Sequence, residues 1–300
     1  MDVKKSISAA LLKGFRAMCG PNDQKRLSKQ VYPVLKEYTD LPYLEDGNPM
    51  HLLDIYVPEG TKDTDHLPVI IDIHGGGWSY GDKELNKNYC LHLAERGFAV
   101  VNISYRLCPE YTIVDQMQDC NAALLWVKNN LGKYPMDPNR IYLTGDSAGG
   151  QLAAHLAAAN LSDEMCAAYK MERAGLNVKA VALTSGVPYL NVGGIYDVYT
   201  AGIRPEGYAY AMYNNYGNLD ACLDAVKEYP PVILFTSLLD VVANWQTVRA
   251  TKDLQARGIA CKLDFQLNPK LGHVYPVAYS DSKYGKRAGD QTAAWFNKYR

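Results

Sequence analysis

A serine placed between two glycines is the strongest chemical signal in this sequence. Ser147 lies between Gly145 and Gly149, after a strand-like stretch (141–144) and before an Ala- and Leu-rich helical stretch (151–159). Strand, tight turn and helix in this order are typical of a nucleophile elbow. The glycines leave room for a strained backbone because they carry no Cβ atom. The turn also puts the serine at a helix N-terminus, where free N–H groups favour developing negative charge.

A second glycine-rich turn, His74-Gly-Gly-Gly-Trp78, directly follows the β-branched run 69–73. Three consecutive glycines are costly in conformational entropy, so something must need bare backbone there. We expect an oxyanion hole, in which each N–H donor is worth about 2.7–4 kcal/mol of transition-state stabilisation. Its expected donors are the N–H groups of Gly75, Gly76, Gly77 and Ala148, with His74 and Asp146 as supporting residues. The alternative is an ordinary glycine-rich turn after a strand.

A serine hydroxyl is a poor nucleophile at neutral pH and needs a general base. Of the six histidines, only His273 is expected in a loop just beyond a late strand, on the same edge of the sheet as Ser147. The base needs a carboxylate that fixes its tautomer, and Asp240 ends the preceding strand. Asp264 is the competing acid, but it lies within a strand. We therefore expect a triad of Ser147, His273 and Asp240, although Asp240 alone would be read as a helix cap or loop acid.

Composition argues against several other classes of function. The formal net charge of -1 gives no sign of a nucleic-acid or anionic-membrane partner. No window approaches the ~20 apolar residues that span a bilayer. Seven scattered cysteines form no Cys-x-x-Cys pair, which favours reduced thiols in a cytoplasmic protein. No cysteine occupies an elbow and no cluster has metal-ligand spacing, so we expect neither a cysteine nucleophile nor a metal.

The elements that must position these residues alternate between strand and helix. Strands are expected over 52–57, 69–73, 98–103, 141–144, 178–183, 231–236 and 261–267, and helices over 86–96, 114–130, 151–159, 250–257 and from 283 onward. This alternation predicts a mainly parallel sheet with helices on both faces. We expect one α/β catalytic domain over residues 46–300.

Two segments fall outside the alternation. Residues 1–45 are expected to be helical, with a break at Gly20-Pro21 and a second helix from Asp23 to Glu37, and to form an N-terminal cap or arm. The stretch 186–229 has no clear βα unit but contains eight tyrosines. Such an insertion lies over the ligand-binding edge of an open sheet, so we expect a lid rather than a surface excursion. The candidate pocket residues are Trp78, Tyr189, Tyr208 and Tyr275.

Taken together, the motifs resemble the hormone-sensitive-lipase-like family of α/β-hydrolase esterases over roughly residues 50–299. The matching pieces are His74-Gly-Gly-Gly-Trp78, Tyr105-Arg-Leu-Cys-Pro-Glu110, Asp137-Pro138, Gly145-Asp-Ser-Ala-Gly-Gly150, Asp240 and His273. Ser104 and Cys108 replace the Asp and Ala of the family's second motif, and Asp240-Val-Val-Ala-Asn-Trp245 departs from its Asp-Pro-Leu-x-Asp-Glu motif. The order Ser147, Asp240, His273 is that of α/β-hydrolases. The resemblance implies an α/β-hydrolase fold with an eight-stranded core, a helical cap built from the N-terminal region and the mid-chain insertion, and no cofactor.

We therefore expect a serine carboxylesterase that hydrolyses short-chain acyl esters of small molecules through an acyl-enzyme. The tyrosine-rich insertion also suits a sugar or aromatic ester, so acetyl or feruloyl esters of carbohydrates are a second substrate class. Two alternatives stay open, an amide or peptide hydrolase of the same fold and a ligand receptor on a hydrolase scaffold. Receptors of this superfamily typically lose a triad residue, which argues against the second. Acyl length and oligomeric state, a homo-oligomer included, are left open.

Overall fold

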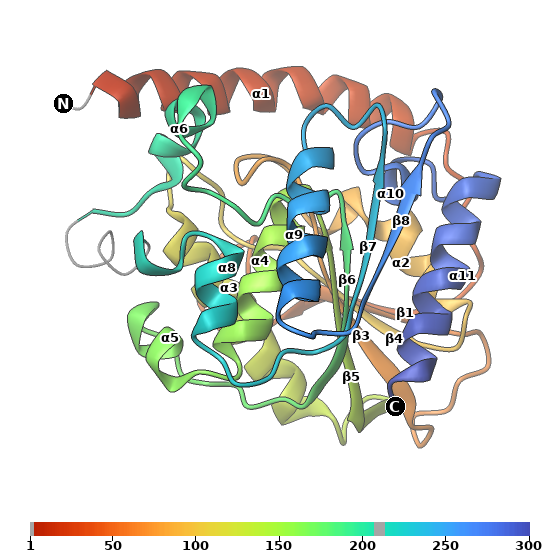
Figure 1. Ribbon diagram of the computed structural model, residues 1–300. Coiled ribbons are helices and arrows are strands. Elements are labelled where there is room, and N and C mark those ends of the chain that lie inside the picture. The colour runs from red at the N-terminus through yellow and green to blue at the C-terminus, as the bar shows by residue number, and fades with distance from the viewer. Residues whose placement is uncertain (1–2, 207–213) are drawn as a thin grey trace.

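An eight-stranded sheet forms the centre of the protein, in the order β1-β2-β4-β3-β5-β6-β7-β8. The computed structural model describes residues 3–206 and 214–300 (Figure 1). The strands are β1 (Lys36–Pro42), β2 (Leu52–Val57), β3 (Leu67–Ile73), β4 (Ala99–Ile103), β5 (Met136–Asp146), β6 (Val178–Thr184), β7 (Val232–Ser237) and β8 (Cys261–Gln266). β2 pairs antiparallel with β1 and β4, and all other pairs are parallel. The expected mostly parallel α/β sheet is confirmed.

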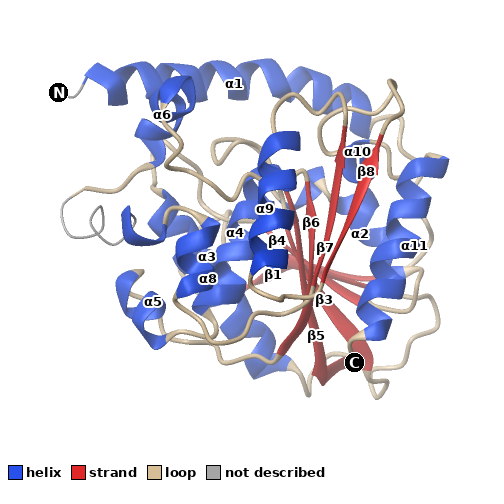
Figure 2. Ribbon diagram, viewed as in Figure 1, coloured by secondary structure: helices blue, strands red, loops and turns tan. Residues whose placement is uncertain are grey.

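Helices cover both faces of this sheet (Figure 2). The helices α3 (Ile113–Asn130), α4 (Ser147–Ala159) and α9 (Asn244–Ala256) share one buried cluster, and α2 (Lys87–Ala94), α10 (Tyr275–Ala278) and α11 (Lys283–Lys298) share the other. β3 contributes to both clusters, because Ile71 and Ile73 point to one face and Ile70 to the other. Its continuous β-branched run is therefore that of a strand covered on both faces.

The N-terminal segment differs from the expectation in two ways. α1 (Val3–Leu27) is one continuous helix that contains Pro21, so the expected break at Gly20-Pro21 is wrong. Arg16 and Arg26 bind backbone carbonyls of the core on either side of the proline, and these tertiary contacts outweigh its low helix propensity. The expected second helix to Glu37 is also wrong, because residues 36–42 form β1 at the antiparallel edge of the sheet.

α1 runs across the carboxyl ends of the parallel strands, along the top of Figure 1, beside α6 (Gly194–Thr200). Ser8 joins the two segments, since its Oγ donates to the Tyr199 carbonyl and accepts the Gly202 N–H at 2.7 Å. The described residues of the 186–229 stretch form short helices, among them α6, η2 (Ala201–Ile203) and α8 (Leu219–Asp224). α1 and this insertion thus meet above the edge of the sheet that carries the candidate site. None of the described helices has the length and apolar character that a bilayer crossing requires.

Candidate active site

Ser147 lies at the turn from β5 into α4 with a φ of +49°, a left-handed conformation that is strained for a residue with a side chain. The flanking glycines permit this turn. A Cβ on Gly145 would lie 2.4 Å from the Gly149 carbonyl oxygen, and one on Gly149 would lie 2.0 Å from the Ile73 carbonyl oxygen. The spacing Gly-x-Ser-x-Gly is therefore required by close backbone contact, and it presents the serine hydroxyl at the carboxyl edge of the sheet.

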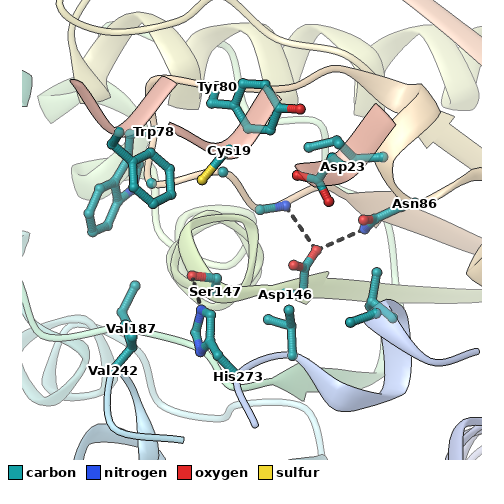
Figure 3. A pocket seen from close by; sticks show the side chains of 18 of the residues that line it. Cys19, Asp23, Trp78, Tyr80, Asn86, Asp146, Ser147, Val187, Val242 and His273 are labelled. Carbon is teal, nitrogen blue, oxygen red and sulfur yellow. Dashed lines mark hydrogen bonds between the residues drawn. The ribbon is translucent and has the colours of Figure 1, made fainter. Parts of the chain in front are cut away.

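Ser147, His273 and Asp240 come from three separate loops and form one hydrogen-bonded chain. Ser147 Oγ lies 2.8 Å from His273 Nε2, and His273 Nδ1 lies 2.8 Å from Asp240 Oδ1 (Figure 3 shows the first contact). Because Nδ1 donates to the carboxylate, Nε2 is left to accept the serine proton. Asp264, the competing acid, lies on β8 and accepts from Gln266 instead.

The Asp240 carboxylate is fully buried, and burial by itself disfavours its charge. Its hydrogen bond to His273 and the charge of that ring act in the opposite direction, and together with the Ala243 N–H at 2.9 Å they hold the pKa of Asp240 below its usual range. Thr236 Oγ1 lies 3.1 Å from its second oxygen. The carboxylate is thus kept ionised and fixed in place against the imidazole.

The glycine turn after β3 uses its N–H groups in two ways. The N–H of Gly75 donates to Asp146 Oδ1 at 2.8 Å (Figure 3), so the expectation that Gly75 joins an oxyanion hole is wrong. Gly76 and Gly77 adopt φ values of +112° and +57° and line the same pocket as Ser147. Within residues 3–206 and 214–300, their N–H groups have no acceptor. Ala148 is the second residue of α4, so its N–H also lacks an intrahelical partner.

A buried polar network holds this turn from below. Asn86 donates from Nδ2 to Asp146 Oδ1 and to Asp72 Oδ2, both at 2.8 Å. Burial raises the pKa of Asp146, and burial together with the Asp146 charge raises the pKa of Asp72 to about 8. Sequence reasoning missed Asn86 and Asp72. The one available signal was an aspartate inside the β-branched run of β3, where an ionised side chain would be costly.

His74 supports the turn from the other side. Its ring stacks on Tyr105 with centroids 4.3 Å apart, and its Nδ1 lies 2.6 Å from the Gly75 carbonyl oxygen. Burial lowers the pKa of His74 to about 4, so the ring is neutral at physiological pH. A neutral histidine whose Nδ1–H donates to the Gly75 carbonyl constrains the backbone of the turn.

A pocket of about 480 Å³ lies over Ser147 and His273. Its walls come from the glycine turn, from α1, from the insertion and from the loops after β7 and β8. The contributions of α1 and the insertion are Phe15, Cys19, Asp23, Arg26, Val187, Tyr196 and Tyr199. Sequence reasoning missed the α1 residues, because nothing in their spacing indicates contact with motifs more than 50 residues away. For the insertion, the sequence indicated only that a tyrosine-rich segment would lie over the site, and it did not indicate which tyrosines would line the pocket.

The four candidate pocket residues have different outcomes. Trp78 lines the pocket and donates from Nε1 to Gln151 Oε1 at 2.9 Å. Tyr189 and Tyr275 do not line it, and that expectation is wrong. Tyr189 is buried and its hydroxyl donates to Asp253 Oδ2. Tyr275 is buried in the cluster that α2, α10 and α11 share. Tyr208 lies outside the described residues. In the described part of the chain, no three His, Cys, Asp or Glu side chains gather in a metal-binding group.

Comparisons with known proteins show which sequences this chain is similar to. The BD-FAE family model matches residues 53–194. A probable isoprenylcysteine alpha-carbonyl methylesterase of Oryza sativa subsp. japonica is 42% identical over 106 residues, which are 35% of this chain and 24% of that protein. The carboxylesterase NlhH of Mycobacterium tuberculosis is 40% identical over 104 residues, 34% of this chain and 32% of that protein. The chain therefore spans only about a quarter to a third of these relatives' length.

Solved structures match over nearly the whole chain. Esterase B of Lactobacillus rhamnosis superposes with a TM-score of 0.90 at 26% identity, covering 97% of this chain and 95% of that one. A bacterial heroin esterase matches with a TM-score of 0.71 at 22% identity over 100% and 98% of the two chains, which supports the fold alone.

The sheet order, the nucleophile turn and the match to esterase B together define an α/β-hydrolase fold. Its motifs resemble those of the hormone-sensitive-lipase-like esterases, and the proteins to which it is similar are named as esterases.

Proposed function

We propose that the protein is a carboxylesterase that hydrolyses short-chain acyl esters of small molecules. One observation carries the proposal, namely the hydrogen-bonded chain from Ser147 through His273 to the buried carboxylate of Asp240. The esterase names of its relatives and of esterase B add support. Fold alone would not separate an esterase from other hydrolases, so the argument depends on the site.

In the first step, His273 Nε2 removes the Ser147 proton while Oγ attacks the ester carbonyl carbon. The carbonyl oxygen becomes an oxyanion, and the N–H groups of Gly76, Gly77 and Ala148 are the donors we assign to it. Asp240 holds Nδ1 and stabilises the imidazolium that forms. His273 then gives its proton to the leaving alcohol oxygen, and an ester of Ser147 with the acyl group remains.

In the second step, water takes the place of the alcohol. His273 Nε2 removes a proton from this water as its oxygen attacks the acyl carbon, and the same oxyanion donors hold the second tetrahedral intermediate. Collapse returns the proton to Ser147 Oγ and releases the carboxylic acid. The free enzyme is restored without any group besides the chain's own residues and water.

The size and walls of the pocket favour short acyl chains. A cavity of about 480 Å³ lies at the small end of the range for ligand pockets, roughly 300–1,000 Å³. We propose that α1 and the insertion act together as the cap that closes it, with Tyr196 and Tyr199 on its wall. Acetyl or feruloyl esters of carbohydrates are the second substrate class, because tyrosines suit a sugar or an aromatic acyl group.

The test is a series of p-nitrophenyl esters from acetate to palmitate. We expect kcat/KM to be highest between acetate and butyrate, and Ser147→Ala to lower kcat on the order of 10⁴–10⁶-fold with unchanged circular dichroism. Ser28→Ala, on an exposed serine, is the matched control and should behave as wild type. Appreciable turnover by Ser147→Ala would overturn the proposal. If the protein cleaves p-nitroanilides but none of the esters, the amide hydrolase is favoured. If it binds ligands but turns over neither kind of substrate, the receptor is favoured.

A further inference from the structure

The pocket has two chemically different ends. In Figure 3, Trp78, Val187 and Val242 lie to one side of Ser147, and Asp23 and Asn86 lie to the other. The first end is apolar, and the second is built around ionic and amide groups. An ester bound with its carbonyl at Ser147 extends one arm toward each end. The two arms of the preferred ester therefore meet different chemistry.

Asp23 and Arg26 supply two of the charges of the second end, and both come from α1. Arg26 donates from Nε to Asp23 Oδ1 at 2.9 Å and from Nη2 to the Leu85 carbonyl at 3.3 Å. Their side chains are only 26% and 22% exposed, respectively. The third nitrogen, Arg26 Nη1, is buried and has no acceptor among the residues that the structure describes. A buried guanidinium N–H of this kind is satisfied when a ligand oxygen reaches it.

The charges around this end favour a neutral oxygen over an anionic one. Arg26 is already paired with Asp23, and the Asp146 carboxylate lies in the same lining, so a substrate carboxylate would meet two negative charges. Burial and the Asp23 charge raise the pKa of Tyr80 to about 12, which leaves it a neutral phenol on the same wall. A hydroxyl group suits this pair of residues, because its oxygen accepts from a guanidinium N–H and its proton donates to a carboxylate.

We propose that Asp23 and Arg26 form a hydroxyl-binding subsite, so that the preferred substrates are esters with one short apolar arm and one hydroxylated arm, as in an ester of a polyol or sugar. The inference rests on the proposed esterase function and narrows it. It assigns to α1 a choice between substrates, whereas the triad and the glycine turn carry the reaction. The shared chemistry is the hydroxylated arm, which either the alcohol or the acyl half of the ester could supply.

Two pairs of esters test the subsite. Glycerol 1-butyrate and propyl butyrate differ only in two hydroxyls on the alcohol arm, and ethyl 3-hydroxybutyrate and ethyl butyrate differ in one hydroxyl on the acyl arm. We expect wild type to prefer the hydroxylated member of one pair. Arg26→Met should then lower kcat/KM for that member by about tenfold or more, mainly through KM, and change the plain member less than about threefold. The pair whose preference Arg26→Met changes shows whether the hydroxylated arm is the alcohol or the acyl half of the ester.

Two further variants keep the test decisive. Arg26→Lys retains a donor without the planar fork and should fall between wild type and Arg26→Met. Lys25→Met changes an exposed neighbour on the same helix and should leave both ratios as in wild type. An equal loss of kcat/KM for both members of each pair would show that Arg26 acts only on the structure of α1, and this would overturn the subsite. The absence of any loss in either pair would also overturn it.

Failure of the function and failure of the subsite give different results. If wild type hydrolyses neither plain ester, or if Ser147→Ala hydrolyses them, then the esterase proposal fails and the subsite fails with it. If plain esters are cleaved in a Ser147-dependent way but Arg26→Met does not alter the preference for hydroxylated ones, only the subsite fails.

Discussion

Replacing Asp72 by Asn should stabilise the protein at neutral pH. Asp72 is fully buried on β3, and it accepts one hydrogen bond from Asn86 at 2.8 Å. Its other oxygen has no partner in the described part of the chain. Burial, with the Asp146 charge, raises its pKa from 3.8 to about 8. At pH 7 the folded protein therefore holds this side chain protonated, whereas the unfolded chain releases the proton.

The magnitude follows from the two pKa values. Between pH 3.8 and about 8 the folded state binds a proton that the unfolded state lacks, so the free energy of unfolding falls as the pH rises. The contribution of Asp72 to stability is therefore fully present below the pKa that Asp72 has in the unfolded chain. It is lost as the pH rises through the pKa that Asp72 has in the folded protein. The slope is about 1.4 kcal/mol per pH unit, or about 2.7 kcal/mol from pH 5 to pH 7. Asparagine has nearly the same shape and does not titrate.

Urea unfolding of wild type and Asp72→Asn at pH 5, 6 and 7 measures this effect. The difference in unfolding free energy, variant minus wild type, should rise by about 2.7 kcal/mol across that range. His74 and His155, each with a pKa lowered to about 4 by burial, titrate in both proteins and cancel in the difference. Ser28→Ala, at an exposed residue that does not titrate, should show a flat difference. A difference for Asp72→Asn that stays constant or falls with pH would refute the reasoning.

Two further substitutions test the catalytic geometry. Asp240→Asn should lower kcat on p-nitrophenyl butyrate by about 10³–10⁴-fold, because the amide would donate to His273 Nδ1 and leave Nε2 protonated; near-normal steady-state turnover would count against the assigned acid. Gly149→Ala should lower the free energy of unfolding in urea by about 3 kcal/mol or more, since its Cβ would lie 2.0 Å from the Ile73 carbonyl. Gly14→Ala, where a Cβ meets nothing within 4 Å, is the control and should not destabilise, so equal effects of the two would contradict the steric argument.

Features that depend on short-range constraints were predictable from the sequence. Gly145 and Gly149 mark the sharp turn because their missing Cβ atoms are needed within one element junction. The β-branched run of β3 indicates a strand buried on both faces for an equally local reason. The pairing of Ser147 with His273 followed from topology, because the carboxyl ends of parallel strands meet at one edge of the sheet.

Features that depend on long-range contacts were not predictable in this way. Pro21 indicated a helix break, yet contacts made by Arg16 and Arg26 with distant carbonyls hold α1 together. The N–H of Gly75 was an expected oxyanion donor, but an aspartate 71 residues away accepts it. Tyr189 was expected in the pocket because its segment is rich in tyrosine, and tyrosine content carries no information on the direction of a side chain.

The position of Asp146 explains why the three glycines after β3 have different roles. This carboxylate belongs to the residue just before Ser147, and it binds the N–H of Gly75, the first glycine of the turn. The nucleophile and the turn are therefore fixed to each other by one hydrogen bond of 2.8 Å, and no group in the described part of the chain accepts the N–H groups of the next two glycines. Asn86 links the same carboxylate to the sheet below. The groups assigned to the chemistry thus depend on the sheet and its buried network, whereas α1 and the insertion line the pocket above them. Changes in α1 should accordingly alter which ester is preferred without altering how its bond is cleaved.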